Sequence, residues 1–230
     1  MTRWLLALIY FLLATPCAFA AEADLRVEKI ISDDELLLND NRTLRLSGIK
    51  AVDAVDYLNA KALHQNILWQ NPVTDRYGRI QATVFLQGHK ESLQDDLLSE
   101  GLAFVYPATG DVEAWIQEEA TARHANKNYW ATHPDTPADS AEKLYGSYGF
   151  VTGIVTEAAR IKNKVYLNFG TDWHSDFTIT IAAHDLRAFK HQEMKPLEWQ
   201  GRKVRVRGWV KRDFGPMITV TDPHQIELLK

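Results

Sequence analysis

The most specific signal in this sequence is Asp75-Arg76-Tyr77-Gly78-Arg79, which runs on into the alternating segment Gln81-Ala82-Thr83-Val84-Phe85-Leu86. Glycine adopts positive φ without steric cost, so Gly78 permits a tight turn that leads directly into a strand. Arg79 then stands on a rigid element, where a guanidinium suits bidentate binding of phosphate. The arginine and tyrosine before Gly78 add a second charge and a ring. The alternative interpretation is an ordinary solvated hairpin tip.

Segments on both sides of this turn extend the pattern. Residues 93–106 read LQDDLLSEGLAFVY, residues 27–36 read VEKIISDDEL, residues 44–53 read LRLSGIKAVD, and residues 118–130 read EEATARHANKNYW. Together with the DRYGR turn they resemble the staphylococcal nuclease family over somewhat less than half of the chain. The resemblance implies an OB-fold barrel with helices packed on it.

The same resemblance implies a nuclease site whose parts can be checked position by position. A nuclease of this family holds Ca²⁺ with two aspartates, activates water with a glutamate and binds the phosphate with two arginines. Arg45 and Arg79 match the two arginines, and Asp34 matches the first aspartate. Lys50 stands at the second aspartate, and Asp53, one methylene shorter, at the glutamate.

Lys50 is the most damaging of these changes. Its ammonium group coordinates no metal and repels a divalent cation, so we expect no Ca²⁺ unless the nuclease site is active after all. Lys50 either replaces the cation as a charge that holds phosphate, or is a surface lysine paired with Asp34 or Asp53. The opposing hypothesis is a working phosphodiesterase with a rearranged metal site built from Asp33, Asp34 and Glu35.

The N-terminal residues predict export. Arg3 precedes an apolar run, Trp4 to Ala14, that is too short to span a bilayer, and Ala18-Phe19-Ala20 is a small-x-small cleavage site. We therefore expect a signal peptide over residues 1–20 and a mature chain, periplasmic or secreted, that begins at Ala21 and has no stable membrane span. It would lack cysteine, because Cys17 is the only one. An uncleaved anchor is the alternative.

Composition favours two domains in the remainder. Residues 131–144 are polar, contain prolines and have no apolar periodicity, which predicts a linker between a nuclease-like domain at 21–130 and a second domain at 145–230. Residues 22–144 carry 12 basic and 21 acidic side chains, a net charge of −9, whereas residues 145–230 carry 13 and 9, a net charge of +4. The acidic half should repel polyanions and the basic half should not.

Hydrophobic patterns predict an α+β, mainly β chain. The first domain is expected to have strands near 24–31, 35–38, 43–46, 67–70 and 79–86 and helices near 55–64, 92–100 and 112–126, the last with Trp115, Ile116 and Ala120 toward the core. The second shows five strand-like runs, at 148–157, 164–169, 177–181, 203–210 and 217–229, the last with a break at Asp222-Pro223, and a helix near 183–190. That order predicts a five-stranded OB-like barrel.

The run from Lys203 to Lys211 has an informative face. Period-2 alternation directs its valines inward and sends a basic and aromatic set outward: Lys203, Arg205, Arg207, Trp209 and Lys211. Such a stripe can neutralise phosphates and stack a base, although solvated edge strands carry similar residues.

These patterns together predict an exported protein with a degenerate nuclease site. It would bind a phosphate-bearing or polyanionic ligand, such as single-stranded nucleic acid, or act as an envelope scaffold; the alternative is an active metal-dependent nuclease. The candidate ligand-binding residues are Arg76, Tyr77, Lys50, Tyr106, Lys203, Arg205, Arg207 and Trp209. The degenerate catalytic positions are Arg45, Arg79 and Asp53, and Asp34 is the one metal-ligand position that survives.

Overall fold

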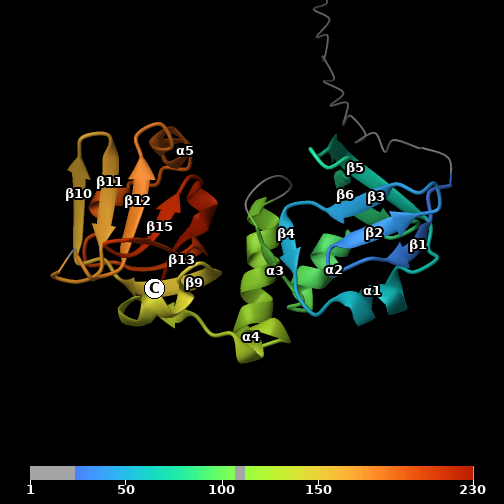
Figure 1. Cartoon of the computed structure of the whole chain (residues 1–230), viewed down its shortest axis with the longest axis horizontal. Coiled ribbons are helices and arrows are strands. Elements are labelled where there is room, and N and C mark those ends of the chain that lie inside the picture. Colours follow the sequence, from blue (N-terminus) through green and yellow to red (C-terminus); the bar gives the residue numbers. More distant parts are fainter. Residues whose placement is uncertain (1–23, 107–111, 173, 230) are drawn as a thin grey trace, which may run out of the picture.

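The computed structural model describes residues 24–106, 112–172 and 174–229, so the predicted signal peptide lies outside the described residues. The chain forms an N-terminal and a C-terminal unit that lie side by side, with helix α3 (Val112–His124) between the two sets of strands (Figure 1). None of the helices in these ranges is long and apolar enough to cross a membrane.

Five strands of the N-terminal unit form one sheet in the order β1-β2-β3-β6-β5. Their bounds are β1 Val27–Ile30, β2 Glu35–Leu38, β3 Thr43–Leu46, β5 Ile67–Thr74 and β6 Ile80–Leu86. Burial alternates along β2 and β3, with Leu36, Leu38 and Leu44 in the core and their neighbours partly exposed. The predicted strands are confirmed here, and β5 extends four residues beyond its predicted end, to Thr74.

A separate pair of strands and four helices complete this unit. They are β4 Ile49–Ala51 with β7 Ala103–Val105, and helices α1 Val55–Lys61, α2 Leu93–Ser99, α3 and α4 Tyr129–Thr132. Helix α2 begins after Ser92, which forms a reciprocal capping box with Asp95. Asp95 also accepts a 2.8 Å hydrogen bond from the Trp115 indole nitrogen, which holds α3 against α2. The expected core residue Ala120 is exposed, and its neighbour Glu119 is buried instead.

The C-terminal unit consists of two sheets. One has the order β10-β11-β12-β15-β14 and the other β16-β13-β9-β8. Their bounds are β8 Thr136–Pro137, β9 Tyr148–Ile154, β10 Glu157–Ile161, β11 Lys164–Asn168, β12 Thr178–Ala182, β13 Lys203–Trp209, β14 Lys211–Asp213, β15 Gly215–Val220 and β16 Ile226–Leu228, with helix α5 at Leu186–His191.

Neither unit is the closed barrel that was expected. In the N-terminal sheet β1 and β5 are the edge strands, and they meet at one isolated bridge between Arg26 and Asn66. In the C-terminal unit the run at 148–157 divides into two strands after Ile154, and the run at 217–229 divides at Asp222-Pro223, where a break was predicted. The fold is therefore α+β with mainly β structure, as predicted, and its sheets are open.

Residues 131–144 are not an unstructured connection. Strand β8 adds to β9 in parallel, and the 3-10 helix Ala138–Leu144 places the fully buried Ala141 in the core of the C-terminal unit. The polar composition of this segment reflects its exposed outer side.

Aromatic side chains join the two units. Phe104 of β7 stacks on Tyr148 with ring centroids 5.5 Å apart and meets Phe150 edge to face at 5.4 Å. Trp130 of α4 also contacts Phe150, at 5.1 Å. Because Phe104, Trp130 and Phe150 are all at least 94% buried, the two units share a small core of their own.

Candidate functional site

The DRYGR turn is closed by Asp75. One oxygen of its carboxylate, Oδ1, accepts hydrogen bonds from the backbone nitrogens of Tyr77 at 2.8 Å and Arg79 at 3.0 Å. Gly78 has φ of +79°, as the predicted tight turn requires, and strand β6 starts directly after Arg79. The turn therefore presents Arg79 at the beginning of a strand.

The Arg79 guanidinium is already paired with two carboxylates. Its Nε and Nη2 lie 2.8 and 2.7 Å from Asp75 Oδ2, and its Nη1 donates to Glu35 Oε1. Arg79 and Arg76 both lie over the ring of Tyr77, which is 67% exposed. A phosphate that binds Arg79 must therefore compete with two internal acids.

The charge pairing lowers the pKa of Asp75. Burial would raise it, but the hydrogen bonds from the Arg79 side chain and from the backbone of Arg79 and Tyr77 bring it from 3.8 to about 2. Asp75 in turn raises the pKa of Arg79.

We expect the stability that ionised Asp75 contributes to be lost in acid. It is fully present above the ordinary pKa of 3.8 and falls as the pH drops toward about 2. The difference in free energy of unfolding between the native protein and Asp75→Asn should shrink over that interval, measured by urea unfolding between pH 6 and pH 2. Asp213→Asn, a change on the exposed strand β14, is the control. A difference that is constant across this range would contradict the assignment.

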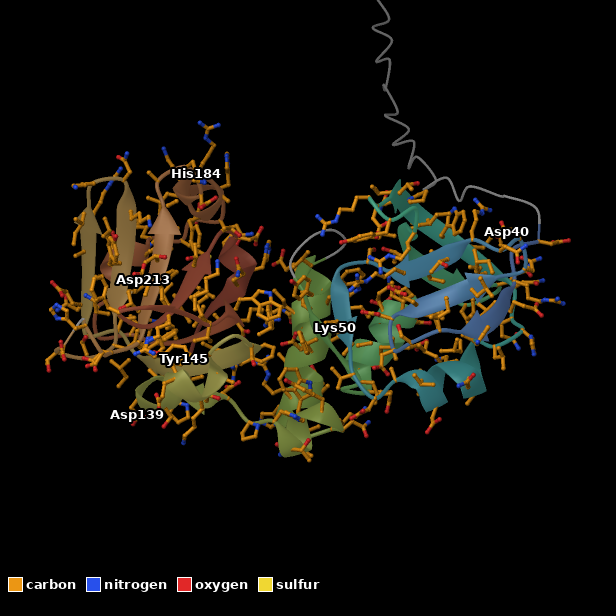
Figure 2. All side chains as sticks on the ribbon, viewed as in Figure 1. Asp40, Lys50, Asp139, Tyr145, His184 and Asp213 are labelled. Atoms are coloured by element: carbon orange, nitrogen blue, oxygen red, sulfur yellow. The ribbon has the colours of Figure 1, made fainter. Side chains whose placement is uncertain are left out.

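Asp34 is the centre of the second charge cluster. It is 4% exposed, and a single carboxylate oxygen, Oδ2, accepts from Arg45 Nη2 at 3.3 Å and from Lys50 Nζ at 3.2 Å. Ser32 Oγ donates to the other oxygen at 3.3 Å. Lys50 is thus paired with Asp34, one of the two partners the sequence offered. Its side chain is 45% exposed, and Figure 2 shows it on β4, in the middle of the molecule.

The three neighbouring acids do not converge on one point. Asp33 Oδ1 accepts from the backbone nitrogens of Ala54 at 2.7 Å and Val55 at 3.2 Å, so this carboxylate caps the first turn of α1. Asp34 pairs with Lys50 and Arg45, and Glu35 pairs with Arg79. Asp53 is exposed, in a left-handed backbone conformation with φ of +54°. The three acids that the opposing hypothesis combines into one metal site therefore each bind a different partner.

These residues do not fit Ca²⁺. Calcium needs six to eight oxygen ligands, mostly carboxylates and carbonyls. Here the oxygen of Asp34 that would face the ion is bonded to two cationic side chains, and no cluster of three acidic, histidine or cysteine ligands occurs within residues 24–106, 112–172 and 174–229.

The basic stripe on β13 needs a correction. Arg207 is 1% exposed, and its Nη1 lies 2.7 Å from Glu119 Oε2 of α3 in the other unit. Arg205 pairs with Asp135 at 2.7 Å and with Glu227 at 3.0 Å. Both arginines point out of their own sheet, as predicted, but toward protein instead of solvent. Lys203, Trp209 and Lys211 keep the exposed positions.

Two residues that organise these sites escaped sequence analysis. Glu119 joins the two units, and the fully buried Gln94 holds the turn from which β4 and Lys50 begin: its Nε2 donates to Ser47 O at 3.3 Å and to Ala82 O at 2.8 Å. Glu119 occupies a buried position in a helix that otherwise exposes its acids, and no pattern within one helix reveals that.

Comparison with known proteins agrees with the resemblance in one segment. Residues 50–132 match the family model described as Staphylococcal nuclease homologue. This segment is similar to that family. The match begins at Lys50 and contains the turn at 75–79 and helices α1 to α4, whereas Asp34 and Arg45 lie before it. No curated protein matches the chain.

Proposed function

We propose that this chain is a binding protein built on a nuclease-like fold that has lost metal-dependent hydrolysis. The observation that carries this proposal is the 3.2 Å contact between Lys50 Nζ and Asp34 Oδ2, an ammonium group where the related nucleases place a metal ligand. A nuclease-like domain fits a role connected with nucleic acid, and the signal-like N-terminus supports a binding or scaffold role in the cell envelope after export.

The geometry supports loss of hydrolysis in two ways. Attack on a phosphodiester needs a hydroxide generated by a metal or by a placed base. Lys50 stands at the position of a metal ligand, and Asp53, a shorter acid, stands at the position of the base. The two arginines that would bind phosphate are already paired with carboxylates. Arg45 pairs with Asp34, and Arg79 pairs with Glu35 and Asp75. Lys50, half-exposed, remains as a charge for an anionic ligand.

We expect the purified protein to leave single- and double-stranded DNA and RNA intact in millimolar Ca²⁺, Mg²⁺ or Mn²⁺, and to give no calorimetric signal with Ca²⁺. A variant with Lys50→Asp and Asp53→Glu should gain Ca²⁺ binding, because it replaces the ammonium group beside Asp34 by a carboxylate and lengthens the acid at position 53.

Two variants make this assay decisive. Arg79→Ala removes a phosphate-binding arginine, and Arg26→Ala, which loses only an exposed pair with Glu28, is its control. Metal-dependent cleavage by the native chain that disappears in Arg79→Ala and persists in Arg26→Ala would overturn the proposal and favour an active nuclease.

A further inference from the structure

A pocket of about 230 Å³ lies where the two units meet, apart from the Asp34 cluster. Tyr106, which follows β7, forms one wall, and β9, β13, β14 and β15 supply most of the others. The lining residues are Tyr106, Tyr148, Gly208, Trp209, Lys211, Thr219, Thr221 and Gln225. The C-terminal unit therefore forms most of the pocket, and Tyr106 of the N-terminal unit completes one wall.

Three rings form an aromatic wall in this pocket. Trp209 is 49% exposed and Tyr106 37% exposed, and the Trp209 indole nitrogen donates to the Tyr106 hydroxyl at 3.3 Å. Tyr148 contacts both rings, with centroids 5.1 Å from Tyr106 and 6.2 Å from Trp209. Exposed rings that are held in place in this way offer a stacking surface for a planar ligand.

The polar groups of the pocket favour an anionic ligand. The Tyr148 hydroxyl is buried and, within the described part of the chain, makes no hydrogen bond, although it can donate one. Lys211 supplies a cation, and the lining includes no carboxylate. By contrast, each of four other pockets includes at least one acid in its lining, such as Glu157 and Asp213 beneath Phe214.

Size narrows the choice of ligand further. A cavity of about 230 Å³ is smaller than most sites for drug-sized molecules, which hold roughly 300–1,000 Å³, so it can enclose one ring while the rest of a larger ligand extends out of it. A neutral sugar would use the rings and the threonines but leave Lys211 without a role.

We propose that this pocket binds one nucleotide unit, with the base stacked on Trp209 and Tyr106 and the phosphate on Lys211. This assignment names a ligand class for the proposed binding role and rests on it. The same chemistry is offered by a free nucleotide and by one residue of a single strand.

The test is calorimetric titration of the full chain with thymidine monophosphate, thymidine, deoxyribose 5-phosphate and pentathymidylate. The monophosphate should bind, and the compounds that lack the phosphate or the base should bind about tenfold more weakly. Binding of the monophosphate alone as tightly as the oligonucleotide would indicate a free nucleotide, and tighter binding of the oligonucleotide would indicate a strand.

Single substitutions test whether the ligand binds in this pocket. Trp209→Ala and Lys211→Glu should each weaken binding about tenfold or more, and Phe214→Ala, which alters an exposed residue outside the pocket, should not.

The outcomes separate this inference from the proposed function. Absence of monophosphate binding at millimolar concentration, equal binding of thymidine, or binding that Trp209→Ala and Lys211→Glu leave unchanged would overturn the pocket assignment while the protein still lacked hydrolysis. Metal-dependent cleavage in the same preparations would overturn the proposed function instead.

Discussion

Replacing Arg207 by alanine should lower the free energy of unfolding by about 3–5 kcal/mol, because it removes one of the two arginines that pair with the buried Glu119 carboxylate, the other being Arg123. Arg207 and Glu119 are each 1% exposed, and Glu119 Oε2 also accepts from the backbone nitrogen of Val105 at 2.7 Å. The second Arg207 nitrogen, Nη2, lies 2.6 Å from Glu227 Oε1. Urea unfolding monitored by tryptophan fluorescence measures the loss.

The opposite charges around Arg207 shift the pKa values of this cluster. Burial would lower the pKa of Arg207, yet Glu119 and Glu227 raise it above its ordinary value. Burial would likewise raise the pKa of Glu227, but Arg207, Arg123 and Arg205 lower it. The stability contributed by ionised Glu227 is thus present above its ordinary pKa of 4.5 and is lost as the pH falls below it.

A double-mutant cycle provides the control for Arg207. Arg207→Met together with Glu119→Leu removes both charges, and the pair should cost less than the sum of the single changes by more than about 1 kcal/mol. Lys195→Ala, which breaks an exposed pair with Glu198, should cost less than about 1 kcal/mol. An Arg207→Ala loss as small as that of Lys195→Ala would show that the units are not joined through this ion pair.

Replacing Gln94 by leucine should cost about 3 kcal/mol, because it removes the side-chain partner of the Val84 backbone nitrogen and of the Ser47 carbonyl, and a buried group left unsatisfied costs about 1–3 kcal/mol. Strand β3 ends its pairing with β6 at Leu46 and Ala82, and beyond that point the Val84 backbone nitrogen donates to Gln94 Oε1 at 3.1 Å. The Gln94 amide thus continues the ladder where β3 leaves the sheet.

The matched control for Gln94 is Gln87→Leu. Gln87 accepts one exposed hydrogen bond, from Asn66 Nδ2 at 3.1 Å, and its replacement should cost less than about 0.5 kcal/mol. If the two leucine variants unfold at the same urea concentration, Gln94 fills space without satisfying the backbone. A larger loss in Gln94→Leu than in Gln94→Glu, which keeps the acceptor for Val84, would assign the effect to the hydrogen bonds.

Local sequence determined much of this protein. Alternation of apolar residues predicted β2 and β3 with their observed bounds, the Ser92 and Asp95 pattern marks the start of α2, and Gly78 predicted the tight turn before Arg79. Each of these features depends on residues within one or two turns of chain, so a short window contains the information. The Lys50 substitution was equally legible, because an ammonium group cannot coordinate a metal wherever it lies.

Only the tertiary structure decided how the charges are shared. Period-2 alternation predicts that the Arg207 side chain lies on the outer face of its own sheet. It does not predict that α3 covers that face and brings the Glu119 carboxylate within 2.7 Å of the Arg207 guanidinium. Likewise, the sequence placed Asp33, Asp34 and Glu35 together, and the fold gave each a different partner. Pairing across more than 80 residues of chain depends on how two units dock, and docking depends on the whole of both surfaces.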